Sequence, residues 1–200
     1  MADPHPNTRL EAFCDAVFAI ALTLLIIDIK VPPSEGIGTT RELWLALRHL
    51  GPSISAFVLS FAIILITWVN HHRFFRALNK SSGLFVYANG FLLLTVVFMP
   101  FPTALVGEYL LTDHAAPAVV IYNSVTAVQA VSWILVTGAA LRLAKDERSV
   151  AHVRDGHRNG YFALVIYSLL AVTAVWFPLT IAIVTTLLWA YWLAFSLRAD

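Results

Sequence analysis

The strongest constraint on this chain is a series of long apolar stretches separated by short polar segments. Residues 12–31, 50–69, 84–106 and 115–143 are each long enough for a bilayer-spanning helix, which needs roughly 20 mostly apolar residues. A further apolar block covers residues 161–197, and 59% of the 200 residues are hydrophobic while 12% are charged. A soluble domain is about 25% charged, so a water-exposed fold does not account for this composition. The sequence predicts an all-α protein that spans a membrane.

The last apolar block is too long for one span. A single helix over 161–197 would measure about 55 Å, against a hydrocarbon core of roughly 30 Å. Pro178 lies near its middle and has no N–H for a helix ladder. We therefore expect two short helices, 161–177 and 179–197, that meet in a tight turn; one kinked helix is the alternative. Residues 1–200 then form a single six-helix transmembrane domain.

Basic residues are distributed unevenly between the two ends of the predicted spans. If the amino terminus is cytoplasmic, ten of the thirteen lysines and arginines fall on the cytoplasmic side. These ten are Arg9, Arg73, Arg76, Lys80, Arg142, Lys145, Arg148, Arg154, Arg158 and Arg198. The other three are Lys30, Arg41 and Arg48. Because cytoplasmic loops are enriched in Lys and Arg, we expect a multi-pass protein of the cell (inner) membrane with both termini cytoplasmic.

Two polar segments between the spans carry further expectations. In residues 35–48, Leu43 and Leu47 lie at helical spacing with Leu50, which predicts a short interfacial helix outside the membrane. Residues 142–159, "RLAKDERSVAHVRDGHRN", read as a polar cytoplasmic loop.

Several functional classes are disfavoured. A net charge of +1 gives no reason to expect a nucleic-acid partner, and a single cysteine, Cys14, excludes a disulfide framework. No nucleophile–base–acid spacing and no phosphate or dinucleotide motif is visible, so we do not expect an enzyme. His71 and His72 are adjacent and point about 100° apart on a helix, which is unsuited to a shared metal site. We expect neither a metal nor a cofactor.

A carboxylate, Asp15, lies about one turn inside the first span. A charge in this position is usually paired or faces a watery cavity. We expect a polar network at its depth, with Arg9 before the span and the "WVNHH" segment at the end of the second span. Trp68, Asn70, His71 and His72 in that segment can all donate hydrogen bonds. The alternative is a plain helix-entrance acid, which the helix dipole favours.

Four residues of the first span share one helical face. Ile20, Thr23, Leu24 and Ile27 follow the i, i+3, i+4, i+7 spacing, and Asp15 lies about 140° from Ile20 around the helix. The chain has no "TVGYG"-like loop and so no carbonyl filter of that type. If the protein conducts ions, apolar side chains must form the constriction, and several copies must surround a closed axis.

The segment "RLEAFCDAVFAIALTLLIIDIKVP" resembles the first helix of the endosomal and lysosomal potassium channel family, transmembrane protein 175, in its prokaryotic branch. Arg9, Phe13, Cys14 and Asp15 match the motif of that helix, with Cys14 where the family has serine. "WVNHHRFF" and "PFPTALVGEY" also resemble the family, and the resemblance covers all six spans in order.

The resemblance implies a fold, an assembly and roles for the matching residues. Four subunits surround a central pore lined by the first helix of each, which makes a leak-type, potassium-selective cation channel in a lipid bilayer. K⁺ is the permeant ion. By position, Ile20 forms the narrowest apolar ring, Leu24 and Ile27 form further rings, and Thr23 forms a hydroxyl ring. The polar network then comprises Arg9, Phe13, Cys14, Asp15, Trp68, Asn70, His71 and His72.

Other functions remain as alternatives. A proton-coupled secondary transporter that uses Asp15 is the first. Transporters commonly place a carboxylate near the bilayer midplane and interrupt helices there, whereas Asp15 is near one end of an unbroken span. A membrane scaffold or enzyme subunit without a transport role is the second. At the outer end of the first span, Asp28 and Lys30 read as a solvated exit from the membrane; a cation-attracting mouth is the alternative for Asp28.

Overall fold

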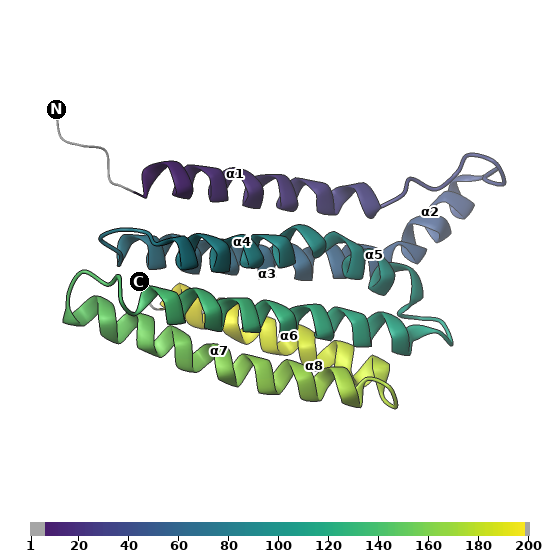
Figure 1. Cartoon of the computed structure of the whole chain (residues 1–200). Coiled ribbons are helices and arrows are strands. Elements are labelled where there is room, and N and C mark those ends of the chain that lie inside the picture. The colour runs from purple at the N-terminus through teal and green to yellow at the C-terminus, as the bar shows by residue number, and fades with distance from the viewer. Residues whose placement is uncertain (1–6, 199–200) are drawn as a thin grey trace.

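The computed structural model describes residues 7–198, and the secondary structure elements within them are helices, which confirms the all-α prediction (Figure 1). The α-helices are α1 (Thr8–Leu24), α2 (Thr40–His49), α3 (Gly51–Arg76), α4 (Gly83–Phe98), α5 (Pro100–Tyr109), α6 (Ala115–Ala140), α7 (Glu147–Thr173) and α8 (Pro178–Arg198). A short 3-10 helix, η1 (Leu25–Asp28), extends α1 by one turn.

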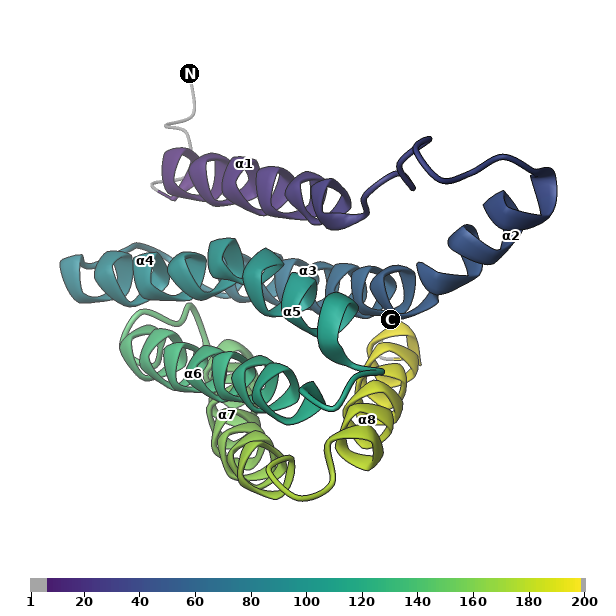
Figure 2. The ribbon, with the colours of Figure 1, turned by 90° about the vertical axis from the view of Figure 1, so that its right-hand side faces the viewer.

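The long helices run side by side, and α1 occupies one edge of the bundle. Both views show α1 against α3 and the α4–α5 segment, with α6, α7 and α8 on the far side of those helices (Figures 1 and 2). The short helix α2 projects from the bundle beyond the end of α1, and none of its residues is buried. This arrangement leaves α1 with neighbours on one face only.

Four helical segments within residues 7–198 are long and apolar enough to cross a membrane: Thr8–Asp28, Gly51–Arg76, Gly83–Tyr109 and Ala115–Ala140. They correspond to the first four predicted spans. A shorter apolar helical stretch, Pro178–Ala194, corresponds to the sixth. The fifth predicted span is the second half of α7, whose first half is polar. The chain is therefore a multi-pass membrane protein by length and composition.

Proline residues define two helix boundaries. Pro178 is the first residue of α8, so the last apolar block is two helices joined by a short turn. Pro100 is the first residue of α5, and α4 ends two residues before it at Phe98. Both breaks follow from the missing proline N–H, which is harmless in the first turn of a helix and disruptive inside one.

The segment 142–159 differs from the sequence prediction, because most of it is helix and not loop. Helix α7 begins at Glu147, and Asp146 is its N-cap. The Asp146 side chain accepts a 2.8 Å hydrogen bond from the N–H of Ser149, and this bond holds the pKa of Asp146 below its usual value. An Asp N-cap followed by an acidic first turn is a helix-start signal that the high charge of the segment obscured.

The predicted short helix over 35–48 is present as α2. A reciprocal capping box fixes its start, because Thr39 accepts from the N–H of Glu42 while Glu42 accepts from the N–H of Thr39.

At the other end of the bundle, two backbone hydrogen bonds join the α3–α4 turn to the α6–α7 turn. The N–H of Asn79 donates to the carbonyl of Leu143, and the N–H of Lys145 donates to the carbonyl of Ala77.

Helices α3 and α5 approach closely near the end from which α2 projects. A Cβ on Gly107 would lie 2.9 Å from the Cα of Ser53, so only glycine permits this approach. The Ser53 hydroxyl donates a 3.2 Å hydrogen bond to the carbonyl of Gly107.

Candidate functional site

The outward face of α1 is an apolar stripe without a neighbour in the described chain. Ile20, Leu24 and Ile27 have exposed fractions of 57%, 38% and 61%, and Thr23 is exposed beside them. The opposite face packs into the bundle, where Cys14, Phe18, Ala21 and Leu25 are almost fully buried. We call Ile20, Thr23, Leu24 and Ile27 the α1 stripe.

The hydroxyl of Thr23 is already engaged within its own helix. Its Oγ1 donates a 2.8 Å hydrogen bond to the carbonyl of Ile20. This bond satisfies the donor, so Thr23 lies on an apolar face without an unpaired O–H. The α1 stripe is therefore apolar apart from one hydroxyl group, which is bonded within its own helix.

A polar cluster lies near the amino-terminal end of α1, where it meets α3 and α4. The indole Nε1 of Trp68 donates a 2.8 Å hydrogen bond to Oδ1 of Asp15. His71 Nε2 lies 2.7 Å from Oδ1 of Asn89, and Nδ2 of Asn89 donates to Sγ of Cys14 at 3.0 Å. Three helices are joined by these bonds, so the cluster fixes α1 against its neighbours.

His72 extends the cluster toward the amino-terminal end of α1, where Glu11 lies. Its Nδ1 lies 2.8 Å from Oε1 of Glu11, which makes an ion pair when the imidazole is protonated. The ring also stacks on Trp68 at a centroid distance of 6.2 Å. His71 packs between Phe18 and Phe75. We call Glu11, Cys14, Asp15, Trp68, His71, His72 and Asn89 the polar cluster.

The structure places three predicted network residues elsewhere. Phe13 is 59% exposed and lies seven residues before Ile20, in line with the α1 stripe. Arg9 is exposed, and no ion pair joins it to another described residue. Asn70 is half-buried, with no hydrogen bond to the other cluster residues. Helical position explains two of these differences, because Phe13 precedes Cys14 and Asn70 precedes His71 by one position, so each points about 100° away from that neighbour.

Sequence reasoning missed two members of the cluster, Glu11 and Asn89. Glu11 precedes Asp15 by four residues and so lies on the same helical face. Asn89 is the one side-chain amide in the predicted span 84–106. An isolated amide in an apolar span needs a partner, since an unpaired polar group is costly there, and this signal was available from the sequence.

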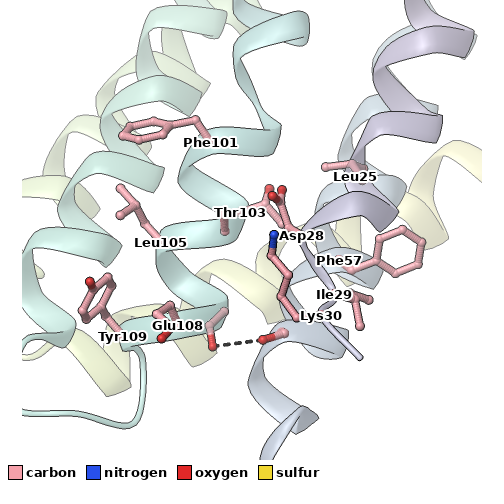
Figure 3. Close-up of a pocket in the computed structure, with 13 residues that line it drawn as sticks. Leu25, Asp28, Ile29, Lys30, Phe57, Phe101, Thr103, Leu105, Glu108 and Tyr109 are labelled. Atoms are coloured by element: carbon pink, nitrogen blue, oxygen red, sulfur yellow. Dashed lines mark hydrogen bonds between the residues drawn. The ribbon is translucent and has the colours of Figure 1, made fainter. Parts of the chain in front are cut away.

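A pocket of about 260 Å³ opens at the opposite end of α1, between η1, α3 and α5. Figure 3 shows its lining, with Asp28 at the end of η1, Lys30 two residues beyond it, Phe57 from α3, and Glu108 and Tyr109 from α5. The pocket mixes two carboxylates, one ammonium and aromatic walls. Among residues 7–198, no group of three His, Cys, Asp or Glu side chains is arranged to hold a metal ion.

Comparison with known proteins gives a matching family model, a similar bacterial protein and a similar solved structure. The family model described as "Endosomal/lysosomal potassium channel TMEM175" matches residues 9–100. A protein of Chamaesiphon minutus named potassium channel is 38% identical over 188 residues, covering 91% of this chain and 92% of the relative. A solved structure described as a lysosomal potassium-selective channel TMEM175 homolog from Chamaesiphon minutus superposes with a TM-score of 0.82 at 35% identity, covering 96% of this chain and 97% of that one.

A vertebrate relative carries a different printed function. The zebrafish (Danio rerio) protein named endosomal/lysosomal proton channel TMEM175 is 33% identical over 181 residues, covering 84% of this chain. This chain spans only 33% of that longer protein. The bacterial and vertebrate names therefore point to two different permeant cations.

Proposed function

The chain belongs to the TMEM175 family of endosomal/lysosomal potassium channels, and from this premise we propose that it forms a potassium-permeable channel. The family is one of channels and not of enzymes. The bacterial relatives named potassium channels support K⁺ as the permeant ion. The solved homolog described as potassium-selective, which covers nearly the whole chain, supports the same ion.

The observation that carries the proposal is the α1 stripe. An edge helix that leaves Ile20, Leu24 and Ile27 exposed needs an apolar environment to cover them, which is either lipid or a neighbouring subunit. Copies of α1 around a closed symmetry axis supply that environment. We take the assembly to be a homotetramer, with Ile20 at the narrowest point and Leu24 and Ile27 forming further apolar rings.

A dry aliphatic ring is a gate as well as a constriction. Ions do not shed water where no polar group replaces it, so a narrow apolar ring blocks them and a wider, wetted ring passes them. Thr23, which is exposed on the same face as the stripe, supplies a hydroxyl ring beside the constriction. A leak-type conductance follows if the ring is wetted at rest.

The polar cluster serves as the anchor of the pore helix in this scheme. It holds the amino-terminal end of α1 to α3 and α4 through the Asp15–Trp68 and Cys14–Asn89 bonds. At the opposite end, Leu25 is buried against the bundle, and Asp28 and Lys30 line the pocket described above. We place this anchored end, both termini and most basic residues at the cytoplasmic side of the inner membrane, because the asymmetry of Lys and Arg favours it.

The second candidate is proton transport, which the name of the vertebrate relative favours. A proton-coupled carrier that uses Asp15 requires that carboxylate to exchange protons with both sides. Asp15 is instead bonded to Trp68 near one end of α1, and α1 is unbroken from Thr8 to Leu24. These two features favour the channel.

Reconstitution into a planar bilayer tests the proposal. Under a potassium gradient with equal sodium and pH, we expect currents that reverse near the potassium equilibrium potential. Currents that reverse near zero under this gradient, and whose reversal potential moves only when a pH gradient is added, would replace K⁺ by H⁺ as the permeant ion. Slow uptake of one ion against its own gradient, driven by a second ion, would contradict a channel altogether.

A further inference from the structure

Helix α7 carries a second exposed stripe, on the side of the bundle away from α1. Its members are Arg154, Arg158, Tyr161, Val165, Leu169 and Val172. They follow one another at spacings of four, three, four, four and three residues, which keeps them within about 80° of the helix circumference. We call them the α7 stripe. All six side chains are exposed, and Figures 1 and 2 show no helix covering α7 on its outer side.

The chemistry of the α7 stripe changes in order along the helix. Val165, Leu169 and Val172 form an apolar band in its second half, with Leu169 exposed to 62%. Tyr161 and its exposed neighbour Phe162 follow toward the amino-terminal end. Arg158 and Arg154 continue the same face by one and two further turns. A protein surface that runs from the acyl chains through the membrane interface to the lipid phosphates changes in this order, from apolar to aromatic to basic side chains.

Aromatic residues also lie beyond the other end of the apolar band. Arg158 lies about 22 Å along the helix from Thr173, where α7 ends. Trp176 and Phe177, both exposed, follow immediately in the turn. Aromatic side chains thus flank the apolar band at both ends, as interfacial residues do on either side of a hydrocarbon core.

The charges around the two arginines leave them able to bind an anion. Nη2 of Arg158 lies 3.2 Å from Oδ1 of Asp155, and both side chains are more than 60% exposed. Such an exposed pair is weak, and the guanidinium has five donors, so it retains donors for a phosphate. Arg154 forms no ion pair with a described residue. His157, on the neighbouring face, is engaged with Thr137.

We propose that Arg154 and Arg158 bind the phosphate groups of anionic phospholipids in the leaflet next to the amino-terminal half of α7. Continuity with the exposed apolar band selects lipid as the occupant, since a soluble anion gains nothing from Val165 and Leu169. The inference rests on the proposed function in one respect: an assembly lined by α1 turns α7 outward to lipid. A loop over 142–159 would have no such face, so the helical start at Glu147 creates it.

The test measures lipid binding to the delipidated full chain in neutral detergent. Phosphatidylglycerol and phosphatidylcholine are titrated separately, and bound lipid is counted by native mass spectrometry. Because a basic residue near an anionic surface contributes about fivefold in affinity, Arg154→Gln and Arg158→Gln should each weaken phosphatidylglycerol binding by about fivefold, and phosphatidylcholine binding should not change. The matched control is Arg41→Gln with Arg48→Gln, two exposed arginines on α2.

Three results would overturn the proposal. The first is equal phosphatidylglycerol binding in the wild type and the Arg154→Gln/Arg158→Gln double variant. The second is an equal loss in the α2 control, which would make net charge the cause. The third is full displacement of the lipid by millimolar inorganic phosphate, which would show that the apolar band contributes nothing to binding. If the glutamine variants fail to fold, the Arg154→Lys/Arg158→Lys variant must retain phosphatidylglycerol binding while added salt weakens it in the wild type.

The lipid assay records no current, so its failure is distinct from a failure of the channel proposal. A chain that binds phosphatidylglycerol through these arginines but passes no potassium would leave the inference intact. A chain that conducts potassium with unchanged lipid binding in the variants would remove the inference alone.

Discussion

Trp68 and Asp15, 53 residues apart in the chain, are joined by a 2.8 Å hydrogen bond from the indole N–H to the carboxylate. The bond links α3 to α1 and gives the Asp15 carboxylate a hydrogen-bond donor near the amino-terminal end of α1. A charge-assisted bond of this kind is stronger than a neutral one. We therefore predict that Asp15 acts through the position of α1 and that its removal affects assembly before it affects ion choice.

Asp15→Ala should destabilise the folded assembly by about 1.5–3 kcal/mol, the usual range for a hydrogen bond to a charged group. The measurement is thermal unfolding in detergent together with size-exclusion chromatography. Trp68→Phe removes the same bond and keeps an aromatic ring, so it should show a loss of similar size. A reversal potential that moves while stability stays unchanged would argue against an anchoring role.

Cys14→Ser should hold α1 at least as firmly as the wild-type residue. Nδ2 of Asn89 now donates to a thiol sulfur, which is a weak acceptor, whereas a hydroxyl oxygen is a good one. Cys14→Ala removes the acceptor and leaves the buried amide unpaired, at a cost of about 1–3 kcal/mol. The melting temperature should be highest for the serine variant, lower for the wild type and lowest for the alanine variant. An alanine variant as stable as the serine variant would show that the Asn89 bond contributes nothing.

Ile20→Ala should increase or alter single-channel current, because a smaller side chain widens the proposed apolar ring. Leu169→Ala is the matched control: its side chain is exposed to a similar extent, but it lies on α7, on the other side of the bundle. Both variants are recorded in the same bilayer with the same potassium gradient. Identical currents in the wild type and Ile20→Ala, or equal changes in both variants, would remove Ile20 from the constriction.

Gly156→Ala should destabilise the contact between α7 and α3. The added Cβ would lie 2.2 Å from Cζ of Phe74, a buried ring that packs on Trp133 and His152. Overpacking of this kind costs about 1–3 kcal/mol. Gly90→Ala in α4 meets no atom within 4 Å and should be neutral or slightly stabilising, because alanine is the better helix former. Equal melting temperatures for the two variants would contradict the close approach.

Helix α2 should lose its first turn in acid. The N–H groups of Gly38 and Thr39 donate to Glu42 and hold the pKa of that carboxyl below its usual value of 4.5. A lowered pKa in the folded state stabilises the helix above pH 4.5, and this contribution is lost as the pH falls through the lowered value. Hydrogen exchange of Thr40–His49, normalised to α6, measures the loss. Glu42→Gln keeps an acceptor without a titration, so protection in that variant should be independent of pH.

Helix content and breaks were largely predictable from the chain. Apolar length predicted the first four spans, and Pro178 marked the boundary of α8 because proline lacks an N–H. The start of α7 was predicted wrongly as a loop. Charge in residues 142–159 suggested solvent, but a charged segment is still helical when it has an N-cap such as Asp146 and packs one face, here Gly156 against Phe74.

The sequence by itself determined that this chain is apolar, helical and interrupted at particular prolines, and that a carboxylate in its first helix needs a partner. It did not decide which face of α1 turns inward, since Phe18, Ala21 and Leu25 on one face are as apolar as Ile20, Leu24 and Ile27 on the other. Nor did it single out Trp68 and Asn89 from the other polar groups. Tertiary packing decided both, because the exposure of a face and the partner of a side chain depend on which helices lie beside α1.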